Sequence, residues 1–396
     1  MQSHTFSRAR GVPICVNGSF SHYGLHEQQP STSRGISRST SLASSRLRGE
    51  TIDPSLPPTF IPRFHDEAAV RRMQYRRLGQ TDMIVSKISF GSAPIGGMFG
   101  NVEDSITQIV ETALRNGINL IDTAYWYGRD RSESILGKIH DADFEPQRNI
   151  ILYETLQALE MARSSGKIRY IGLAGYGLQR LASLIECSSV RIDVLQTYSH
   201  GSMNDNSVGE FTFMLQNKGI GVLNGSPLSM GLLTEQGPPP WHPAPDFIKE
   251  TCLAATHYCM SKNMSISKLA LAYAFEVPGM SSCIVGMDSI QQVRDNIALC
   301  TSCTPLTDLE ERVRDRIMRR YFDRLENAGW SDVDVAAYWK RLKKLGLTAL
   351  ATHRHSSVES LSSTLNGLSM QSSASSSERQ SQPRTPRSRK RSKTIS

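Results

Sequence analysis

Between residues 85 and 300, short apolar segments alternate with longer segments in which apolar residues recur at helical spacing. Short apolar runs indicate buried strands, and a 3.6-residue period indicates amphipathic helices. The expected strands are residues 85–91, 118–124, 168–175, 191–199, 219–227 and 283–287. The expected helices are residues 103–117, 131–138, 152–167, 178–187, 208–217, 246–262, a segment from 265 onward, and 289–300. Strands that alternate with helices predict a parallel sheet.

Small or polar residues recur where these strands end, namely Asp122, Gly175, Gln196, Ser226 and Gly286. A (β/α)8 barrel builds its active site at the carboxyl ends of its strands. A doubly wound nucleotide-binding sheet would instead carry G-x-G-x-x-G after its first strand, and "FGSAPIGG" lacks that spacing. The pattern predicts the α/β fold class and, within it, a (β/α)8 TIM-type barrel.

The barrel is shorter than the fold normally requires. A (β/α)8 barrel of ~250 residues uses roughly 31 residues per strand–helix unit. Val85 to Cys300 is 216 residues, which is about seven units at that rate. One unit is therefore expected to be missing.

The composition indicates tails around this barrel. Only 39% of the residues are hydrophobic, and both ends are rich in Ser and Arg. We expect a disordered tail at 1–63, a barrel with a helical C-terminal extension at 64–345, and a second disordered tail at 346–396. No apolar run approaches the ~20 residues that would span a bilayer.

The net charge of +8 belongs to the tails. Residues 379–396 contribute +7 and residues 1–50 contribute +4, which leaves −3 for the remainder. The sequence therefore predicts no nucleic-acid binding through the barrel and no membrane partner, and the tails are candidate protein-binding segments. We expect a cytoplasmic protein; a mitochondrial presequence at the start and a nuclear-import signal at the end are the alternatives.

The seven cysteines fit reduced thiols in an intracellular protein. Cys300 and Cys303 form a lone C-x-x-C, which is either a redox motif or a pair of ordinary loop cysteines. The spacing alone favours ordinary loop cysteines, because the pair follows a helical pattern and does not open one.

The segment "LIDTAYWYGRDRSESILGKIHDADFEP" carries the candidate chemistry. Asp122 and Tyr127 lie five residues apart, and His140 follows. A tyrosine has an unperturbed pKa of about 10, so a nearby cation must lower it before it can exchange a proton at neutral pH. Each residue also has a structural interpretation: Asp122 as a helix cap, Tyr127 as an aromatic filling the barrel mouth, and His140 as a loop residue.

Several long stretches resemble the aldo-keto reductase superfamily, and within it the L-galactose dehydrogenase-like branch. They are "YRRLGQTDMIVSKISFGSAPIGG", "LIDTAYWYGRDRSESILGK", "GKIRYIGLAGY", "GVLNGSPLSMGLLTEQGPPPWHPA" and "IVGMDSIQQVRDNIA". The resemblance covers about residues 64–345. It implies an eight-stranded barrel that binds a nicotinamide dinucleotide without a Rossmann domain.

The resemblance also implies a catalytic set of Asp, Tyr, Lys and His. Asp122, Tyr127 and His140 match the first, second and last of these. The lysine belongs to a segment that should lie between "ILGK" and "IHD", which are joined directly here. The third strand, its helix and most of the fourth strand are therefore expected to be absent after Lys138, together with the catalytic lysine. Lys138 could replace it only if the helix ended earlier and residues 137–141 formed a strand.

By the same resemblance, one set of residues is expected to bind the cofactor. It comprises Gly91, Ser92, Ala174, Gly175, Gln196, Ser226, Leu228, Gly286, Met287, Asp288, Gln292 and Asn296. Many NADP-using members carry a lysine and an arginine for the 2′-phosphate where this chain has Gly286 and Gln292. A phosphate prefers charge-assisted donors, so NAD is the expected cofactor. NADP is the alternative if Arg294 or Lys268 supplies the charge.

Two functions from different classes remain open. The first is an NAD(P)-dependent oxidoreductase that acts on a sugar, such as an L-galactose-like lactol, or on another small carbonyl substrate such as an aldehyde, and that is impaired by loss of the lysine. The second is a noncatalytic truncated isoform that acts as a binding or regulatory protein. No metal site is expected in either.

Overall fold

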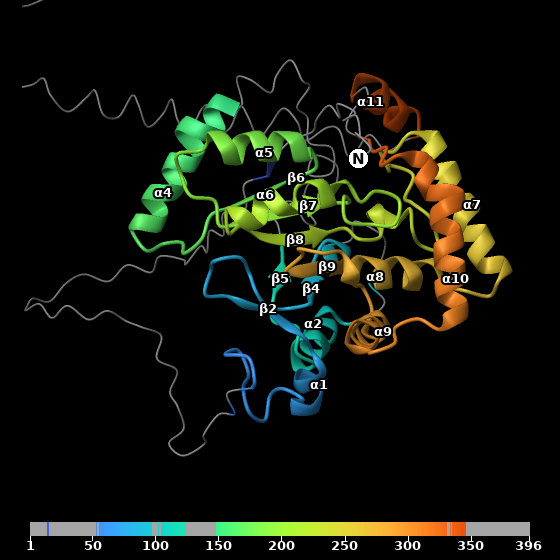
Figure 1. Ribbon diagram of the computed structural model, residues 1–396, viewed down its shortest axis with the longest axis horizontal. Coiled ribbons are helices and arrows are strands. Elements are labelled where there is room, and N and C mark those ends of the chain that lie inside the picture. The colour runs from blue at the N-terminus through green and yellow to red at the C-terminus, as the bar shows by residue number, and fades with distance from the viewer. Residues whose placement is uncertain are drawn as a thin grey trace, which may run out of the picture. The chain divides into compact units, whose positions relative to one another are not determined.

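A computed structural model describes residues 14–15, 53, 55–96, 102, 104–123, 148–330, 333 and 335–345 (Figure 1). All of them belong to one compact unit, Met1–Leu347. The second unit, Thr348–Ser396, lies outside the described residues. So do the expected helix 131–138 and both sides of the Lys138 junction.

The core of this unit is a parallel sheet (Figure 1). Its strand order is β6-β7-β8-β9-β4-β5, and each neighbouring pair is parallel. The strands are β4 (Ile88–Gly91), β5 (Ile121–Asp122), β6 (Gly172–Gly175), β7 (Val194–Tyr198), β8 (Gly221–Gly225) and β9 (Ser282–Gly286). The last strand thus pairs with β4, as barrel closure requires, and among the described residues β5 and β6 do not pair with each other. The fold is a partial (β/α)8 barrel, as the sequence predicts.

Helices follow the strands in the expected alternation. Figure 1 shows α5 and α6 beside β6–β8, and α8 and α9 beside β9. The helices are α1 (Glu67–Arg72), α2 (Ile106–Arg115), α4 (Leu156–Ser164), α5 (Leu178–Cys187), α6 (Thr212–Asn217), α7 (Asp246–Ser261), α8 (Ile266–Glu276), α9 (Ile290–Thr301), α10 (Asp308–Ile317) and α11 (Val335–Lys344). None of the helices in the described part of the chain combines the length and apolarity needed to cross a bilayer.

Helix α5 illustrates how the apolar period determines the packing. Leu178, Leu181, Leu184 and Ile185 lie on one face and are all buried. They pack in one cluster with Leu173 of β6 and Leu195 of β7. Apolar residues at this spacing form a stripe on one face of a helix, and such a stripe predicts that the helix packs against the sheet.

The predicted strand 85–91 is divided in two. β3 (Ile84–Ser86) pairs with β2 (Tyr75–Arg77) in a separate antiparallel hairpin, and β4 begins after Lys87. The Ser86 hydroxyl donates to the Ile88 carbonyl (2.7 Å), which bends the chain at this point. The hairpin contributes Leu78 and Val85 to a cluster with Ile284 of β9, so it covers one end of the sheet interior.

The expected tail 1–63 requires a correction. Leu56 and Phe60 are buried against Val70 of α1, and Arg71 of α1 forms an ion pair with Asp53 (2.7 Å). Ile14–Cys15 form a short strand, β1, which pairs antiparallel with β6. Apolar residues in a Pro-rich segment still fold when a helix offers a surface on which to bury them.

We therefore expect the barrel to need residues 53–63. The sequence alone suggests that a chain of residues 64–350 would melt like the full chain, but that truncation removes Leu56 and Phe60. Burying one such side chain contributes roughly 1.5–3 kcal/mol. Each kcal/mol shifts the melting temperature of a protein this large by roughly 2–4 °C.

Calorimetry of two truncated chains, 53–350 and 64–350, measures this contribution. The shorter chain is expected to melt about 5 °C or more below the longer one. Equal melting temperatures would contradict the packing of this segment on α1.

The apolar residues Ile121 and Ile171 flank the expected gap, and they differ in exposure. Ile121 of β5 is 41% exposed, whereas Ile171, just before β6, is 2% exposed. Ile171 is covered because it packs in the cluster beneath α4 and α5, and the Asp193 carboxylate accepts a hydrogen bond from its backbone N–H (3.0 Å). Of these two isoleucine side chains, the one on β5 is therefore exposed and the one beside β6 is buried.

Candidate active site

The strand register brings the predicted site residues to one edge of the sheet. Gly91 pairs with Asp122 on one side and with Gly286 on the other, so these three lie at the same level. The Ser92 N–H donates to the Asp122 carbonyl (3.0 Å). On the other strands, Ala174 pairs with Gln196, and Tyr198 pairs with Gly225, which precedes Ser226. The structure thus assembles the predicted strand-end residues at the carboxyl edge.

The catalytic prediction is only partly placed. Asp122 is partly buried at the end of β5. Tyr127 and His140 lie outside the described residues, as does Lys138. Their roles therefore stay predictions.

Tyr198 is a site residue that sequence reasoning missed. Burial raises the pKa of its phenol to about 12, and the negative charge of Asp122 adds to this effect, while a hydrogen bond with Ser226 opposes it. The phenol therefore stays protonated at neutral pH. Strand alternation could have found it, because residues two apart share a face and Gln196 was already placed in the site.

Gln196 occupies the space beside Gly225. A Cβ on Gly225 would lie 2.9 Å from the Thr197 carbonyl oxygen and 3.3 Å from Gln196 Nε2. The glycine therefore allows the Gln196 amide to lie across the end of β8. A larger residue at this position would have to displace that amide.

The turn after β8 has an unusual backbone. Ser226, Ser229 and Met230 have φ of 57°, 48° and 54°, followed by Gly231 at 98°. This left-handed conformation costs roughly 1–2 kcal/mol per non-glycine residue. The turn is held by its own bonds, including Met230 N–H to Ser226 Oγ (3.0 Å). Strained backbone often marks ligand-binding segments, so this turn is a candidate ligand-binding segment.

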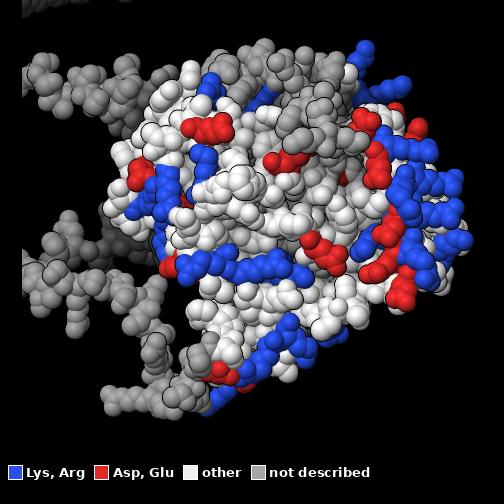
Figure 2. All heavy atoms as spheres, in the orientation of Figure 1, with Lys and Arg blue, Asp and Glu red and all other residues white. Residues whose placement is uncertain are grey.

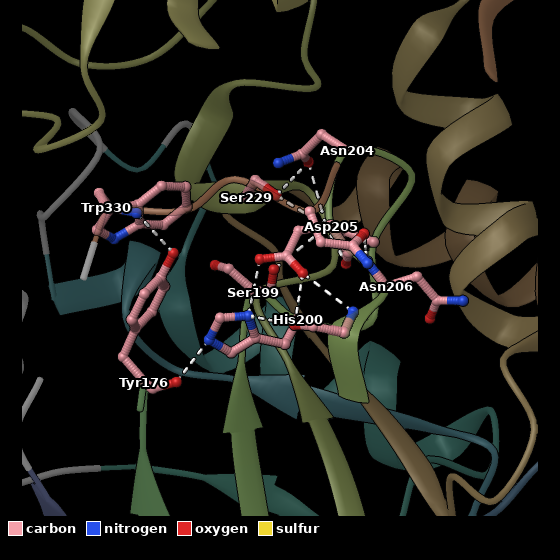
Figure 3. Close-up of polar contacts among 11 residues, drawn as sticks. Tyr176, Ser199, His200, Asn204, Asp205, Asn206, Ser229 and Trp330 are labelled. Carbon is pink, nitrogen blue, oxygen red and sulfur yellow. Dashed lines mark hydrogen bonds and ion pairs between the residues drawn. The ribbon is translucent and has the colours of Figure 1, made fainter. Parts of the chain in front are cut away.

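A largely buried loop, residues 199–207, follows β7 directly and lies beside the strand ends (Figure 3). The Nδ1 atom of His200 lies 2.8 Å from Asp205 Oδ2, and its Nε2 lies 2.5 Å from the Tyr176 carbonyl oxygen. A carbonyl oxygen only accepts, so Nε2 donates. Asp205 Oδ1 accepts from the hydroxyl (2.6 Å) and the N–H (3.0 Å) of Ser207. The loop thereby fixes the backbone directly after β6.

The same loop connects to the turn after β8 and to the C-terminal extension. The Ser229 hydroxyl donates to Asn204 Oδ1 (2.6 Å). The Trp330 N–H donates to the Tyr176 hydroxyl (3.0 Å), and the two rings lie 4.9 Å apart (Figure 3). Three segments that end near the candidate site are therefore held together by one polar network. Sequence reasoning missed it because "HGSMNDNS" looks like a solvated loop.

His242 reinforces this arrangement. Its Nε2 donates to the Ser229 carbonyl (3.1 Å), and its Nδ1 accepts from the Ala244 N–H (3.1 Å). Burial lowers the pKa of His242 to about 3. The ring is therefore neutral at physiological pH and serves as a fixed link in the core.

The expected adenosine segment starts at the end of β9. Gly286 is exposed, and a Cβ there would lie 2.7 Å from the Pro94 ring. Gln292 Oε1 accepts from the Asp288 N–H (3.1 Å), and Asn296 is partly buried one turn further along α9. Met287 differs from the expectation: its side chain is fully buried in the core beside Phe90 and Ile297, which leaves its backbone to contact a ligand.

One of the two cations that could bind a 2′-phosphate already has a partner. Lys268 Nζ lies 2.6 Å from Glu310 Oε1, and Glu310 also closes the capping box at Thr307. Arg294 is exposed on α9. Gly286, at the end of β9, and Gln292, on α9, carry no charge.

The C-x-x-C motif is not a disulfide. Cys300 and Cys303 are both free, and burial raises the pKa of the Cys300 thiol to about 11. A protonated, buried thiol is a poor nucleophile. Among the described residues, no group of three or more His, Cys, Asp or Glu side chains could hold a metal ion.

Charge is mixed on the surface over α10. Figure 2 shows Lys and Arg interleaved there with Asp and Glu. The sequence of α10, "DLEERVRDRI", has the same alternation. This helix therefore presents no uniform cationic surface.

Comparison with known proteins identifies the family. Residues 87–153 and 138–311 match the aldo/keto reductase family. The chain is 34% identical over 289 residues to L-galactose dehydrogenase of Arabidopsis thaliana, covering 59% of this chain and 90% of that protein. It is 27% identical over 206 residues to D-arabinose 1-dehydrogenase of Saccharomyces cerevisiae, covering 49% of this chain and 61% of that protein. The chain belongs to the aldo/keto reductase family.

Among solved structures, aldo-keto reductase AKR11C1 from Bacillus halodurans in its holo form matches with a TM-score of 0.44 and 20% identity. That match covers 62% of this chain and 96% of that one.

Two features of the match are consistent with the internal deletion. The family match comes in two segments that overlap at residues 138–153. The 289 positions aligned with L-galactose dehydrogenase take up 59% of the 396 residues, or about 234, so about 55 positions have no residue here. At roughly 31 residues per unit, that is more than one strand–helix unit and less than two.

Proposed function

We propose that this protein is a nicotinamide-dinucleotide-dependent oxidoreductase that acts on a sugar lactol or an aldehyde, with low turnover. The observation that carries the proposal is the register that places Gly91, Asp122 and Gly286 side by side at the carboxyl edge. The names of its relatives, L-galactose dehydrogenase and D-arabinose 1-dehydrogenase, support a sugar as substrate.

The cofactor-binding residues are proposed as a continuous edge. Gly91, Ser92, Ala174, Gly175 and Gln196 would lie along the nicotinamide end, and Ser226 and Leu228 would lie beside the pyrophosphate. Gly286, the Met287 backbone, Asp288, Gln292 and Asn296 would lie along the adenosine. The nicotinamide supplies the hydride chemistry when it is bound.

The protein's own residues would move the proton. Tyr127 would donate it to, or take it from, the reacting oxygen, and His140 would orient that oxygen. Asp122 would have oriented the lysine that the deletion removes. General acid–base catalysis contributes typically ~10²–10⁴-fold, so a loss of that size is the expected consequence of the deletion.

The deletion also favours a second function, that of a noncatalytic isoform. Such a protein would keep the dinucleotide edge and the surface around α10 and α11 but would turn over no substrate. The two functions differ in one measurement, because only the oxidoreductase reduces NAD in the presence of a sugar.

Single-turnover assays of the full chain with NAD and L-galactose-like sugars test this proposal. We expect slow NADH formation that Tyr127→Phe abolishes. Dinucleotide binding without any NADH formation would support the noncatalytic isoform, and absence of binding would contradict both.

Cofactor preference gives a separate prediction. NAD is expected to bind more tightly than NADP, because Gly286 and Gln292 offer no charge to a 2′-phosphate and Lys268 is paired with Glu310. Quenching of intrinsic fluorescence during titration with each dinucleotide measures the two affinities. Equal or tighter binding of NADP would contradict this prediction.

A further inference from the structure

The amino end of α9 is occupied by a carboxylate from another part of the chain. The Ile290 N–H, at the first residue of α9, donates to Asp104 Oδ2 (2.8 Å). Asp104 lies just before α2, which packs against α9. This bond joins residues 186 positions apart in the sequence.

Neighbouring donors at this helix end are also bound by side chains. The Gln292 N–H donates to Ser289 Oγ (3.3 Å), and the Asp288 N–H donates to Gln292 Oε1 (3.1 Å). Of these three acceptors, only Asp104 carries a charge. Its carboxylate therefore takes the position where the partial positive charge of the helix favours an anion.

This end of α9 is also where a barrel commonly binds phosphate. The usual phosphate position lies at the loops after the last two strands, beside a helix amino end. β8 and β9 are those strands here, and α9 follows β9 directly. A phosphate that approached Ile290 would meet the negative charge of Asp104 instead of a free N–H.

We propose that Asp104 determines cofactor specificity: at the amino end of α9 its carboxylate favours the ribose of NAD over the 2′-phosphorylated ribose of NADP. The inference rests on the proposed dinucleotide binding. A carboxylate retains lone pairs after one hydrogen bond and accepts from a ribose hydroxyl. The same charge repels a 2′-phosphate. An acidic side chain that selects NAD in this way is a known solution in other nucleotide-binding folds.

Substitutions that remove only the charge test the proposal. Asp104→Asn keeps an acceptor for the Ile290 N–H, and Asp104→Ser removes the charge and leaves a shorter hydroxyl. Glu111→Gln is the matched control, since it removes one negative charge from α2 at an exposed ion pair with Arg115. The full chain and each variant are titrated with NAD and with NADP, and their melting temperatures are recorded.

Both Asp104 variants are expected to bind NADP about tenfold more tightly than the unmodified chain, with NAD affinity changed less than about threefold. Glu111→Gln should leave both affinities unchanged. NAD binding with the same NAD-to-NADP ratio in all four proteins would overturn the role of Asp104 and leave the proposed function intact. Binding of neither dinucleotide to any of them would overturn both.

Discussion

Restoring the missing strand–helix–strand segment between Lys138 and Ile139, with its lysine, should raise turnover by about 10²–10⁴-fold. The lysine would give Tyr127 the cation that its proton transfer requires, and Asp122 would orient that lysine. The donor segment would come from an intact relative of the L-galactose dehydrogenase type. Steady-state assays with NAD and L-galactose-like sugars measure the gain.

The same insertion should make thermal unfolding more cooperative. In the described part of the chain, β5 ends the sheet on one side, and the outer edge of β6 is covered by the two residues of β1. A closed barrel pairs every strand, whereas an open edge leaves backbone groups unpaired. Calorimetry of both chains tests this difference.

Two controls distinguish the effect of the lysine on turnover from the effect of the inserted strands on barrel closure. Replacing the inserted lysine by methionine should keep the restored melting behaviour and return turnover to the level of the unmodified chain. Tyr127→Phe in the restored chain should also keep the restored melting behaviour, but it should abolish turnover. If the unmodified chain already turned over at ordinary enzyme rates, and Tyr127→Phe abolished this, the impaired site would be refuted, and Lys138 would be the next residue to substitute.

The parts of the fold that the sequence predicts well are those in which one physical signal dominates. Helix α5 has the predicted bounds because its buried leucines follow the helical period without interruption. The strands β6, β7 and β8 lie within the predicted segments because apolar runs between helices are distinctive, and β9 begins one residue before its predicted segment. β6, β7 and β8 are shorter than predicted, since apolar residues flanking a strand can be buried without joining its hydrogen-bond ladder.

The parts that were missed depend on contacts between distant segments. Leu56 and Phe60 gave no periodic signal, yet α1 supplies a surface that buries them. Asp104 could not be paired with Ile290 before α2 and α9 were known to pack together. Tyr127 and His140 were found by motif alone, and their geometry lies outside the described residues.

The loop 199–207 is the clearest case of a hidden determinant. Ser202, Asn204 and Asp205 are polar and would be expected in solvent, but each is almost completely buried. Their hydrogen-bond partners come from Ser229, His200 and other residues of the loop itself. Sequence alone does not distinguish a solvated polar loop from one that is buried and hydrogen-bonded within the protein.

Asp205→Asn should destabilise the protein by about 1–3 kcal/mol, the usual cost of leaving a buried hydrogen-bonding group without its partner. One carboxylate oxygen faces His200 Nδ1, and the other accepts both donors of Ser207. An amide has one oxygen, so in either orientation its NH₂ group would face donors. Urea unfolding measures the loss in free energy, and His200→Asn should cost a similar amount.

A matched control is available on α7, where His257 is exposed. His257→Asn should change stability by no more than about 0.5 kcal/mol. The double variant of His200 and Asp205 should lose less than the sum of the two single variants, because each single change leaves the other residue buried without its hydrogen-bond partner. Because the Tyr176 carbonyl follows Gly175 and the loop also holds Ser229, weaker NAD binding should accompany the loss of stability. Strictly additive losses, or single variants as stable as His257→Asn, would contradict the coupling between His200 and Asp205.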